Sequence, residues 1–377
     1  MKIAIMTQPL GQNYGGIIQA WALQQVLKGF GHEPVTIDRQ LDSKGPIYHT
    51  ARFGHRFLQN LMGKRKGPLS FERYLPDICQ SNYEFIKRNL RMSEPVHSTD
   101  ELIEHFNAQN YNAVIVGSDQ TWRPCYSPNI GNFFLDFLQD SNIKRIAYAA
   151  SFGTDEWEFT EQQTQYCAQF AKKFDAITVR EDSGVVLCDK YLRVNAEHVL
   201  DPTLLVKKEA YKFLYETKDI PTKQGVYTYI LDQANWKTEI VETVMEVLNR
   251  PQYNNQPKSS MSNPDSGNLD DYSVPSIEGW LKGFSDADFV VTDSFHGTVF
   301  AVIFNKPFVS LVNTGRGASR LYSFAEVLGL SDRLQVDFNR EMITKLLNSP
   351  IDFEVVTSRL DFARASSEKI LMTALNK

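Results

Sequence analysis

Short apolar runs rich in β-branched residues alternate, through the first 200 residues, with longer stretches of helical periodicity. Strands are expected at 2–7, 35–38, 113–117, 145–150, 176–180 and 198–200. Helical patterns lie between them, for example at 17–30 and 161–174. Alternation of this kind predicts a mostly parallel sheet with right-handed crossovers and helices on both faces.

A second series of the same kind follows. Strands are expected at 226–231, 289–292 and 308–312, with helices at 236–248, 277–285 and 298–304. The stretch 251–275 is polar and rich in turn-forming residues, so we expect a loop there with one edge strand at 258–262. Helical periodicity returns at 355–375. The pattern predicts an α/β protein of two doubly wound, Rossmann-like domains that face a cleft, one at 1–205 and one at 206–350.

Composition narrows the class of protein. The 377 residues suffice for two cores, and 42% hydrophobic against 23% charged residues is typical of soluble globular proteins. A formal net charge of -5 argues against a general nucleic-acid-binding protein. The first apolar run is too short for a signal peptide and no run suits a membrane span, so we expect a cytoplasmic protein. The four cysteines lack any CxxC spacing, and we expect buried free thiols.

Two glycines mark the junction after the first strand. The chain reads NYGG at 13–16, directly before an amphipathic helical pattern. Glycines at a helix N-terminus let an anion approach free backbone N–H groups. Asn13, Gly15 and Gly16 are therefore candidates for binding a phosphate or a carboxylate. The alternative is that Asn13 only caps the helix, since the spacing is neither GxGxxG nor a Walker loop.

Polar residues also follow the later strands of the first domain, where ligands of such sheets bind. Asp119 and Trp122, in GSDQTW, offer an acceptor for hydroxyls and a flat face for a sugar ring. A capping aspartate and a core tryptophan are the alternative. Ser151 follows the next strand and Arg180 the one after it. The Arg180 guanidinium suits a carboxylate or phosphate, unless it only pairs with a neighbouring acid.

The second domain combines a histidine with arginines at its strand ends. DSFHG stands at 293–297 between an expected strand and helix, and GRGASR follows the next strand. The candidate residues of these two motifs are Asp293, Ser294, His296, Gly297, Arg316 and Arg320. An imidazole can give or take a proton near neutral pH, and two arginines can hold an anion of more than one charge. The combination indicates an anionic donor whose transfer needs acid catalysis, with the turn 293–297 exposed toward the cleft.

Together these motifs resemble the polysaccharide pyruvyl transferase family. The matching pieces, in the family's order, are NYGGIIQAWALQQVL (13–27), VIVGSDQTW (114–122), AYAASFG (147–153), VREDSG (179–184), VLDPTLL (199–205), TDSFHGTVFAVIFNKPF (292–308) and GRGASRL (315–321). The resemblance implies a fold similar to GT-B glycosyltransferases, with the acceptor on the N-terminal domain and the donor on the C-terminal domain. It also implies that a C-terminal helix, at 351–377, packs back on the N-terminal domain.

The implied activity is transfer of a pyruvate ketal group from phosphoenolpyruvate onto two hydroxyls of a sugar, in a bacterial surface polysaccharide or its lipid-linked precursor. No cofactor or metal is required for it. The carboxylate and phosphate of phosphoenolpyruvate suit Arg180 and the two arginines of GRGASR. We expect His296 to protonate the methylene carbon or to assist phosphate departure, and Asp119 or Asp293 to orient hydroxyls.

Two other functions stay open. A GT-B-type glycosyltransferase that uses a nucleotide sugar would have the same fold, and Glu326 would then be a candidate for the ribose contact. A non-catalytic relative that only binds a sugar or an anion belongs to a different class.

A basic segment bears on the location of the acceptor. Residues 43–71 contain six basic residues and no acid, together with apolar residues spaced for one stripe of a helix. Such a segment can rest on an anionic membrane, where lipid-linked sugars reside. Residues 44–66 are thus a candidate for peripheral contact with the inner face of the cytoplasmic membrane. An ordinary helix packed on its own domain is the alternative.

Overall fold

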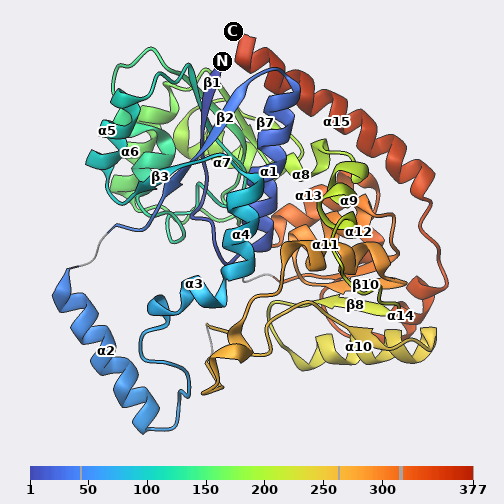
Figure 1. Ribbon diagram of the computed structural model, residues 1–377. Helices are drawn as coiled ribbons and strands as arrows, with labels where there is room; N and C mark the ends of the chain where they lie inside the picture. Colours follow the sequence, from blue (N-terminus) through green and yellow to red (C-terminus); the bar gives the residue numbers. More distant parts are fainter. Residues whose placement is uncertain (43–44, 262–263, 314–316, 377) are drawn as a thin grey trace.

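The computed structural model describes residues 1–42, 45–261, 264–313 and 317–376, and two parallel β-sheets form its two halves (Figure 1). The first sheet contains, in spatial order, β3 (Met92–Val96), β2 (Glu33–Arg39), β1 (Lys2–Met6), β4 (Ala113–Val116), β5 (Lys144–Ala150), β6 (Ala176–Val179) and β7 (Glu197–His198). The second contains β12 (Leu334–Gln335), β11 (Phe308–Leu311), β10 (Phe289–Thr292), β8 (Val226–Tyr229) and β9 (Gln252–Tyr253). The predicted α/β fold is confirmed.

Each sheet has one place where the strand order reverses. It lies between β1 and β4 in the first sheet and between β8 and β10 in the second. Ligands of doubly wound sheets bind outside the carboxyl ends of the strands at such a place. The loops that follow these four strands are therefore the expected ligand-binding positions of the two halves.

Helices connect the strands and cover the sheets. They are α1 (Tyr14–Gly29), α2 (Pro46–Leu61), α3 (Leu75–Ile78), α4 (Gln80–Asn89), α5 (Thr99–Ala108), α6 (Glu161–Ala171), α7 (Asp182–Leu187), α8 (Pro202–Leu205), α9 (Lys208–Glu216), α10 (Asn235–Leu248), α11 (Ile277–Asp286), α12 (Phe295–Ile303), α13 (Ser319–Leu328), α14 (Arg340–Leu347) and α15 (Phe353–Asn376). No described helix combines the length and the apolar character of a membrane-spanning segment.

The hydrophobic core runs from one half into the other. Successive side chains of a strand point to opposite faces, so Ile3 and Ile5 enter one core while Ala4 and Met6 enter another. The core that holds Ile3 and Ile5 continues to Trp280 of α11 in the second half. The two halves are therefore joined by shared apolar packing as well as by the chain.

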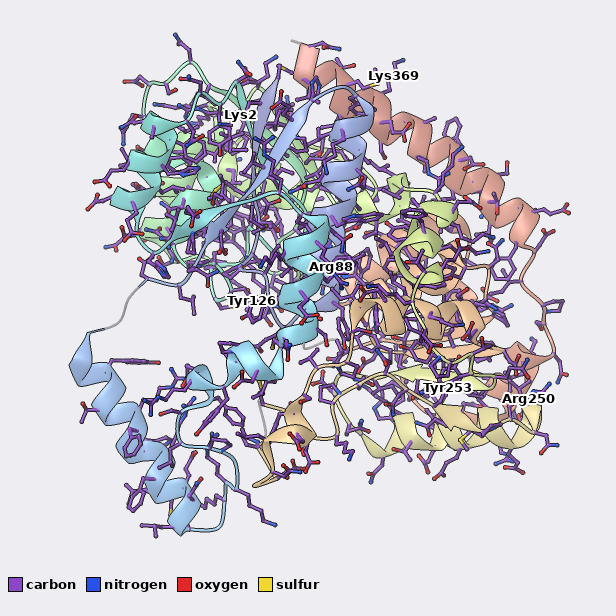
Figure 2. All side chains as sticks on the ribbon, in the orientation of Figure 1. Lys2, Arg88, Tyr126, Arg250, Tyr253 and Lys369 are labelled. Carbon is purple, nitrogen blue, oxygen red and sulfur yellow. The ribbon has the colours of Figure 1, made fainter. Side chains whose placement is uncertain are left out.

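Polar contacts reinforce this junction. The Tyr14 hydroxyl at the start of α1 donates to the carbonyl of Pro275 at 2.5 Å, and its ring stacks on Trp280 with centroids 5.3 Å apart. Arg88 of α4 pairs with Glu278 of α11 at 2.9 Å and lies between the two halves in Figure 2. The start of α1 is thus held directly against the second half.

The C-terminal helix α15 returns to the first half, as the resemblance implied (Figure 1). Lys144 Nζ of β5 donates to the carbonyl of Leu375 at 2.8 Å, and the backbone N–H of Leu200 donates to Ser367 Oγ at 3.0 Å. The domain boundaries at 205 and 350 stay predictions.

Three strands have no counterpart in the predicted pattern, and one predicted strand is wrong. β3 reads MSEPV and lies at the edge of its sheet, where a proline and polar residues are tolerated, so its composition hides it. β9 and β12 are only two residues long. The edge strand expected at 258–262 does not form in its described residues, 258–261.

Of the cysteines, Cys79, Cys167 and Cys188 are buried as expected, but Cys125 is exposed.

Candidate active site

Buried polar residues and one phenylalanine gather where the carboxyl ends of β4, β5, β6 and β7 meet α12 and α13 of the second half. We call them the interface cluster: Ser118, Asp119, Ser151, Arg180, Glu181, Asp201, Phe295, His296 and Arg320. Each is at most 8% exposed. Buried ionisable groups are costly unless they are paired or used, so a cluster of this kind at a switch point is a candidate functional site.

Asp201 is the centre of the cluster. Its Oδ2 accepts hydrogen bonds from Arg180 Nη1 at 2.7 Å and from Ser118 Oγ at 2.6 Å, and its Oδ1 accepts from the backbone and the hydroxyl of Thr203. The same Oδ2 lies 3.7 Å from His296 Nε2. Burial alone would raise the pKa of Asp201, but His296, Arg180 and Ser118 outweigh it and hold the pKa well below the usual range. Asp201 is therefore a fixed negative charge beside the histidine.

Arg180 joins this carboxylate to an aromatic ring. Its Nη2 lies 3.6 Å from Asp119 Oδ1, and its guanidinium carbon lies 4.7 Å from the centre of the Phe295 ring. Burial alone would lower the pKa of Arg180, but the charges of Asp201, Asp119 and Glu181 raise it. Within the described part of the chain, its Nε and Nη2 have no hydrogen-bond partner. One edge of the guanidinium thus has the donors that a carboxylate or phosphate would take in two parallel hydrogen bonds.

Arg320, in the first turn of α13, approaches the same ring. Its guanidinium carbon lies 5.8 Å from the centre of Phe295. Burial lowers the pKa of Arg320 to about 10, and the charge of Arg180 adds to this, while Glu181 and Asp119 oppose it. Arg320 is still charged at neutral pH. Two buried guanidinium groups that repel each other favour an anion in their neighbourhood.

His296 touches the first half of the protein directly. A Cβ atom built on Gly15 would lie 2.1 Å from His296 Nδ1, so the imidazole packs against the backbone at the start of α1. No described residue gives His296 Nε2, which faces Asp201, a hydrogen-bond partner. Its contact with Asp201 is therefore an ion pair when the ring is protonated, at a distance longer than a hydrogen bond. Gly15, predicted from the sequence to bind an anion, here makes room for the histidine.

Asp119 and Asn13 meet at the switch point of the first sheet. Asn13 Nδ2 donates to Asp119 Oδ2 at 3.4 Å, and a Cβ on Gly16 would lie 3.3 Å from the same oxygen. The Asn13 side chain does not cap α1, so the alternative role for it is not realised. Asp119 has a φ of 75°, a conformation that costs non-glycine residues about 1–3 kcal/mol and concentrates at functional sites.

Comparison with known proteins places the chain in a family. The sequence matches the family described as polysaccharide pyruvyl transferase over residues 13–315, which include every residue of the interface cluster except Arg320. The chain belongs to the polysaccharide pyruvyl transferase family. No curated protein matches the chain.

Solved structures show the same fold as this pyruvyl transferase family member. The UDP-GlcNAc 2-epimerase from Neisseria meningitidis bound to UDP-GlcNAc is 10% identical, with a TM-score of 0.52 over 100% of this chain and 99% of the other. The UDP-GlcNAc 2-epimerase from Methanocaldococcus jannaschii in complex with UDP-GlcNAc and UDP is 11% identical, with a TM-score of 0.50 over 92% of each chain. At such identities the likeness shows the fold alone, that of the GT-B type.

Three of the predicted site residues have structural partners, and for Asp293 and Trp122 these conflict with the expected roles. Asp293 forms a buried ion pair with Lys237 at 2.6 Å and also accepts the backbone N–H groups that follow β8, so it orders that loop. Trp122 is fully buried, donates to the carbonyl of Phe133 and stacks within the core, so it offers no face to a sugar. Ser294 caps α12 by accepting the N–H of Gly297. Arg316 lies outside the described residues.

The turn at 293–297 is buried rather than exposed. The first half of the protein covers it, because His296 packs on Gly15. A Cβ on Gly297 would lie 2.2 Å from Thr292 Oγ1, so only glycine fits at this point of the turn. Close packing of the two halves, which the pattern of one strand and one helix cannot reveal, explains the difference.

Two acids of the interface cluster had not been predicted from the sequence: Asp201 and Glu181. Glu181 Oε1 accepts Ser151 Oγ at 3.0 Å and the backbone N–H of Phe152 at 2.8 Å. Both acids directly follow predicted strands, in VREDSG and VLDPTLL, and that position was the available signal. Among the described residues, no group of three or more His, Cys, Asp or Glu side chains is arranged to hold a metal ion.

Proposed function

We propose that this protein transfers a pyruvate ketal group from phosphoenolpyruvate onto two hydroxyls of a sugar, in a bacterial surface polysaccharide or its lipid-linked precursor. The observation that carries the proposal is the interface cluster. It combines a histidine, two arginines and three acids, all buried, in a member of the pyruvyl transferase family. Both halves of the protein contribute to it, which suits a reaction between two substrates.

The arginines would hold the donor. Phosphoenolpyruvate carries a carboxylate and a phosphate, and the Nε and Nη2 donors of Arg180 match either group in a bidentate contact. Arg320, on the side of the second half, would take the other anionic group. Asp119, Glu181 and Asp201 balance these charges in the free protein, so the site does not hold a large unpaired positive charge before the donor arrives.

His296 would act as the acid. Its proton adds to the methylene carbon of phosphoenolpyruvate, and the adjacent carbon becomes cationic. A sugar hydroxyl attacks that carbon and loses its proton. The carbon–oxygen bond to phosphate then breaks, and the second hydroxyl closes the ketal. Of the two hydroxyl protons, one restores His296 and the other leaves on the phosphate, so the reaction needs no further reagent.

The acids would serve the histidine and the acceptor. Asp201, a fixed charge 3.7 Å from Nε2, stabilises the imidazole while it carries the extra proton. Asp119, in its strained turn beside Asn13, is placed to accept a hydrogen bond from a sugar hydroxyl. Of the two candidates for this role, Asp119 suits it better than Asp293, because Asp293 forms a buried ion pair with Lys237 at 2.6 Å and holds the loop after β8 through two backbone N–H groups.

The rival function, glycosyl transfer from a nucleotide sugar, shares the fold. Its candidate ribose contact, Glu326, is exposed, whereas Arg320 near the start of the same helix is buried. The geometry therefore favours recognition of a small anion over that of a nucleoside. A non-catalytic relative would bind the anion without releasing phosphate.

The test separates these three functions. The protein is incubated with phosphoenolpyruvate or with UDP- and GDP-sugars, together with lipid-linked galactose, mannose or N-acetylmannosamine acceptors. Released phosphate, released nucleotide and the mass of the acceptor are then measured. We expect phosphate release with an acceptor that gains a ketal, and loss of this activity in His296→Asn but not in His97→Asn, which changes an exposed histidine. Nucleotide release, or binding of phosphoenolpyruvate without turnover, would exclude the proposal.

A further inference from the structure

Helix α2 stands away from the rest of the protein (Figure 1). Its outward-facing apolar side chains and the methionine that follows it are 48–69% exposed: Phe53, Phe57, Leu58, Leu61 and Met62. Phe53, Phe57 and Leu61 are spaced by four residues and share one face of the helix. Soluble proteins rarely leave so many large apolar side chains together in water unless the surface has a partner.

The opposite side of α2 is tied to the segment that follows it. Arg52 and Arg56 both pair with Glu72, and Arg56 Nη1 also donates to the carbonyl of Leu69 at 2.8 Å. Asn60 Nδ2 donates to the carbonyl of Gly67 at 3.2 Å. These contacts hold one side of the helix against the segment that follows it, and Phe57 and Leu61 lie on the other side.

The base of this hairpin, residues 46–72, is anchored to the second half. The backbone N–H of Lys66 donates to the carbonyl of Pro264 at 3.1 Å, and the ring of Phe71 meets that of Tyr272 edge-on at 5.0 Å. The apolar side of α2 therefore projects from a fixed base.

The charge of the hairpin indicates which kind of partner its apolar face binds. Between residues 45 and 71 the chain has five basic residues and no acid. Glu72 neutralises part of this charge, but Lys64 and Lys66, next to the C-terminal end of α2, are exposed. A basic helix with a mainly apolar face suits an anionic lipid surface, where the apolar residues enter the acyl boundary and the lysines meet headgroup phosphates.

We propose that α2 docks this protein on an anionic lipid bilayer through Phe53, Phe57, Leu58, Leu61 and Met62, with Lys64 and Lys66 against the headgroups. The docking rests on the hairpin and is independent of the chemistry of the interface cluster. Only its purpose rests on the proposed function: a docked enzyme would meet a lipid-linked sugar at the surface where that sugar resides.

The test is flotation of the full-length protein with lipid vesicles, without phosphoenolpyruvate or acceptor. Vesicles of phosphatidylcholine with phosphatidylglycerol are compared with vesicles of phosphatidylcholine alone. The double variant Phe57→Ser/Leu61→Ser removes the apolar face, and Lys64→Gln/Lys66→Gln removes the exposed charge. The matched control is Phe213→Ser/Phe362→Ser, since these side chains are 73% and 80% exposed on other helices.

We expect the wild type and the control to float with the anionic vesicles. The apolar variant should lose at least about tenfold in partitioning, since each buried side chain contributes several-fold or more. The lysine variant should lose roughly thirtyfold at low salt, at about fivefold per cation. Wild-type protein that stays unbound, or an apolar variant that floats as well as the control, would overturn the proposal. So would lipid-free dimers, seen by light scattering, that the apolar substitutions dissociate.

The two proposals fail separately. If the protein floats but releases no phosphate from phosphoenolpyruvate, the docking surface stands and the proposed activity falls. If it turns over a water-soluble acceptor but never floats, the activity stands and the docking surface falls.

Discussion

Substitution of Gly15 by alanine should inactivate the protein without unfolding it. The new Cβ would lie 2.1 Å from His296 Nδ1, more than 1 Å short of the 3.4 Å at which ordinary contacts begin. The imidazole would have to move by at least that much, or α1 and α12 would have to separate. Displacement of a catalytic group by about 1 Å costs roughly a hundredfold in rate. The α1 helix itself would gain stability, because alanine is favoured over glycine in helices by about 0.5–1 kcal/mol.

The assay is the steady-state release of phosphate from phosphoenolpyruvate with the acceptor, together with thermal unfolding of each variant. The matched control is Gly29→Ala, at the other end of α1, because a Cβ there would meet nothing within 4 Å. Gly15→Ala should lose about a hundredfold in kcat while its melting temperature stays close to that of the control. If Gly15→Ala kept the wild-type rate, the contact between His296 and the first half would have no role in catalysis.

Three further predictions concern the charges. Lys237→Met should cost about 3–5 kcal/mol in urea unfolding, because it leaves Asp293 charged and buried, and the added change Asp293→Asn should restore most of the loss. The pKa of Asp201 is lower in the folded than in the unfolded protein, so the stability that Asp201 contributes is present above about pH 4 and is lost as the pH falls. The difference in unfolding free energy between the wild type and Asp201→Asn should therefore be largest at neutral pH. It should shrink below about pH 4. Arg320→Lys should raise the KM for phosphoenolpyruvate about tenfold or more, because an ammonium cannot make the paired hydrogen bonds of a guanidinium, and an unchanged KM would separate Arg320 from the donor site.

Periodicity sufficed to predict the parallel sheets and the positions of the site residues along the chain. Apolar runs and the polar residues after them are local features, so Asp119, Arg180 and His296 could be selected from the sequence. What each side chain faces depends on how the two halves pack. Trp122 stands three residues after Asp119 yet points into the core.

The acids illustrate the same limit. Asp201 precedes a proline and caps the short helix α8, so its sequence context is that of an ordinary helix start. Only the packing of α12 against the first half brings His296 within 3.7 Å of it. Conversely, Asp293 adjoins the histidine motif in sequence, but the lysine that pairs with it comes from α10, more than fifty residues earlier. Long-range contacts of this kind leave no local pattern.

The fate of one oxygen atom shows whether the interface cluster transfers a ketal. Phosphoenolpyruvate is labelled with a heavy isotope in the oxygen that bridges carbon and phosphorus, and the labelled products are weighed by mass spectrometry after reaction with the acceptor. Ketal transfer breaks the carbon–oxygen bond, so all of the label should leave in the phosphate, with one ketal formed on the acceptor for each phosphate released. Label retained in pyruvate, or phosphate released without a ketal, would show that the interface cluster does not perform this transfer.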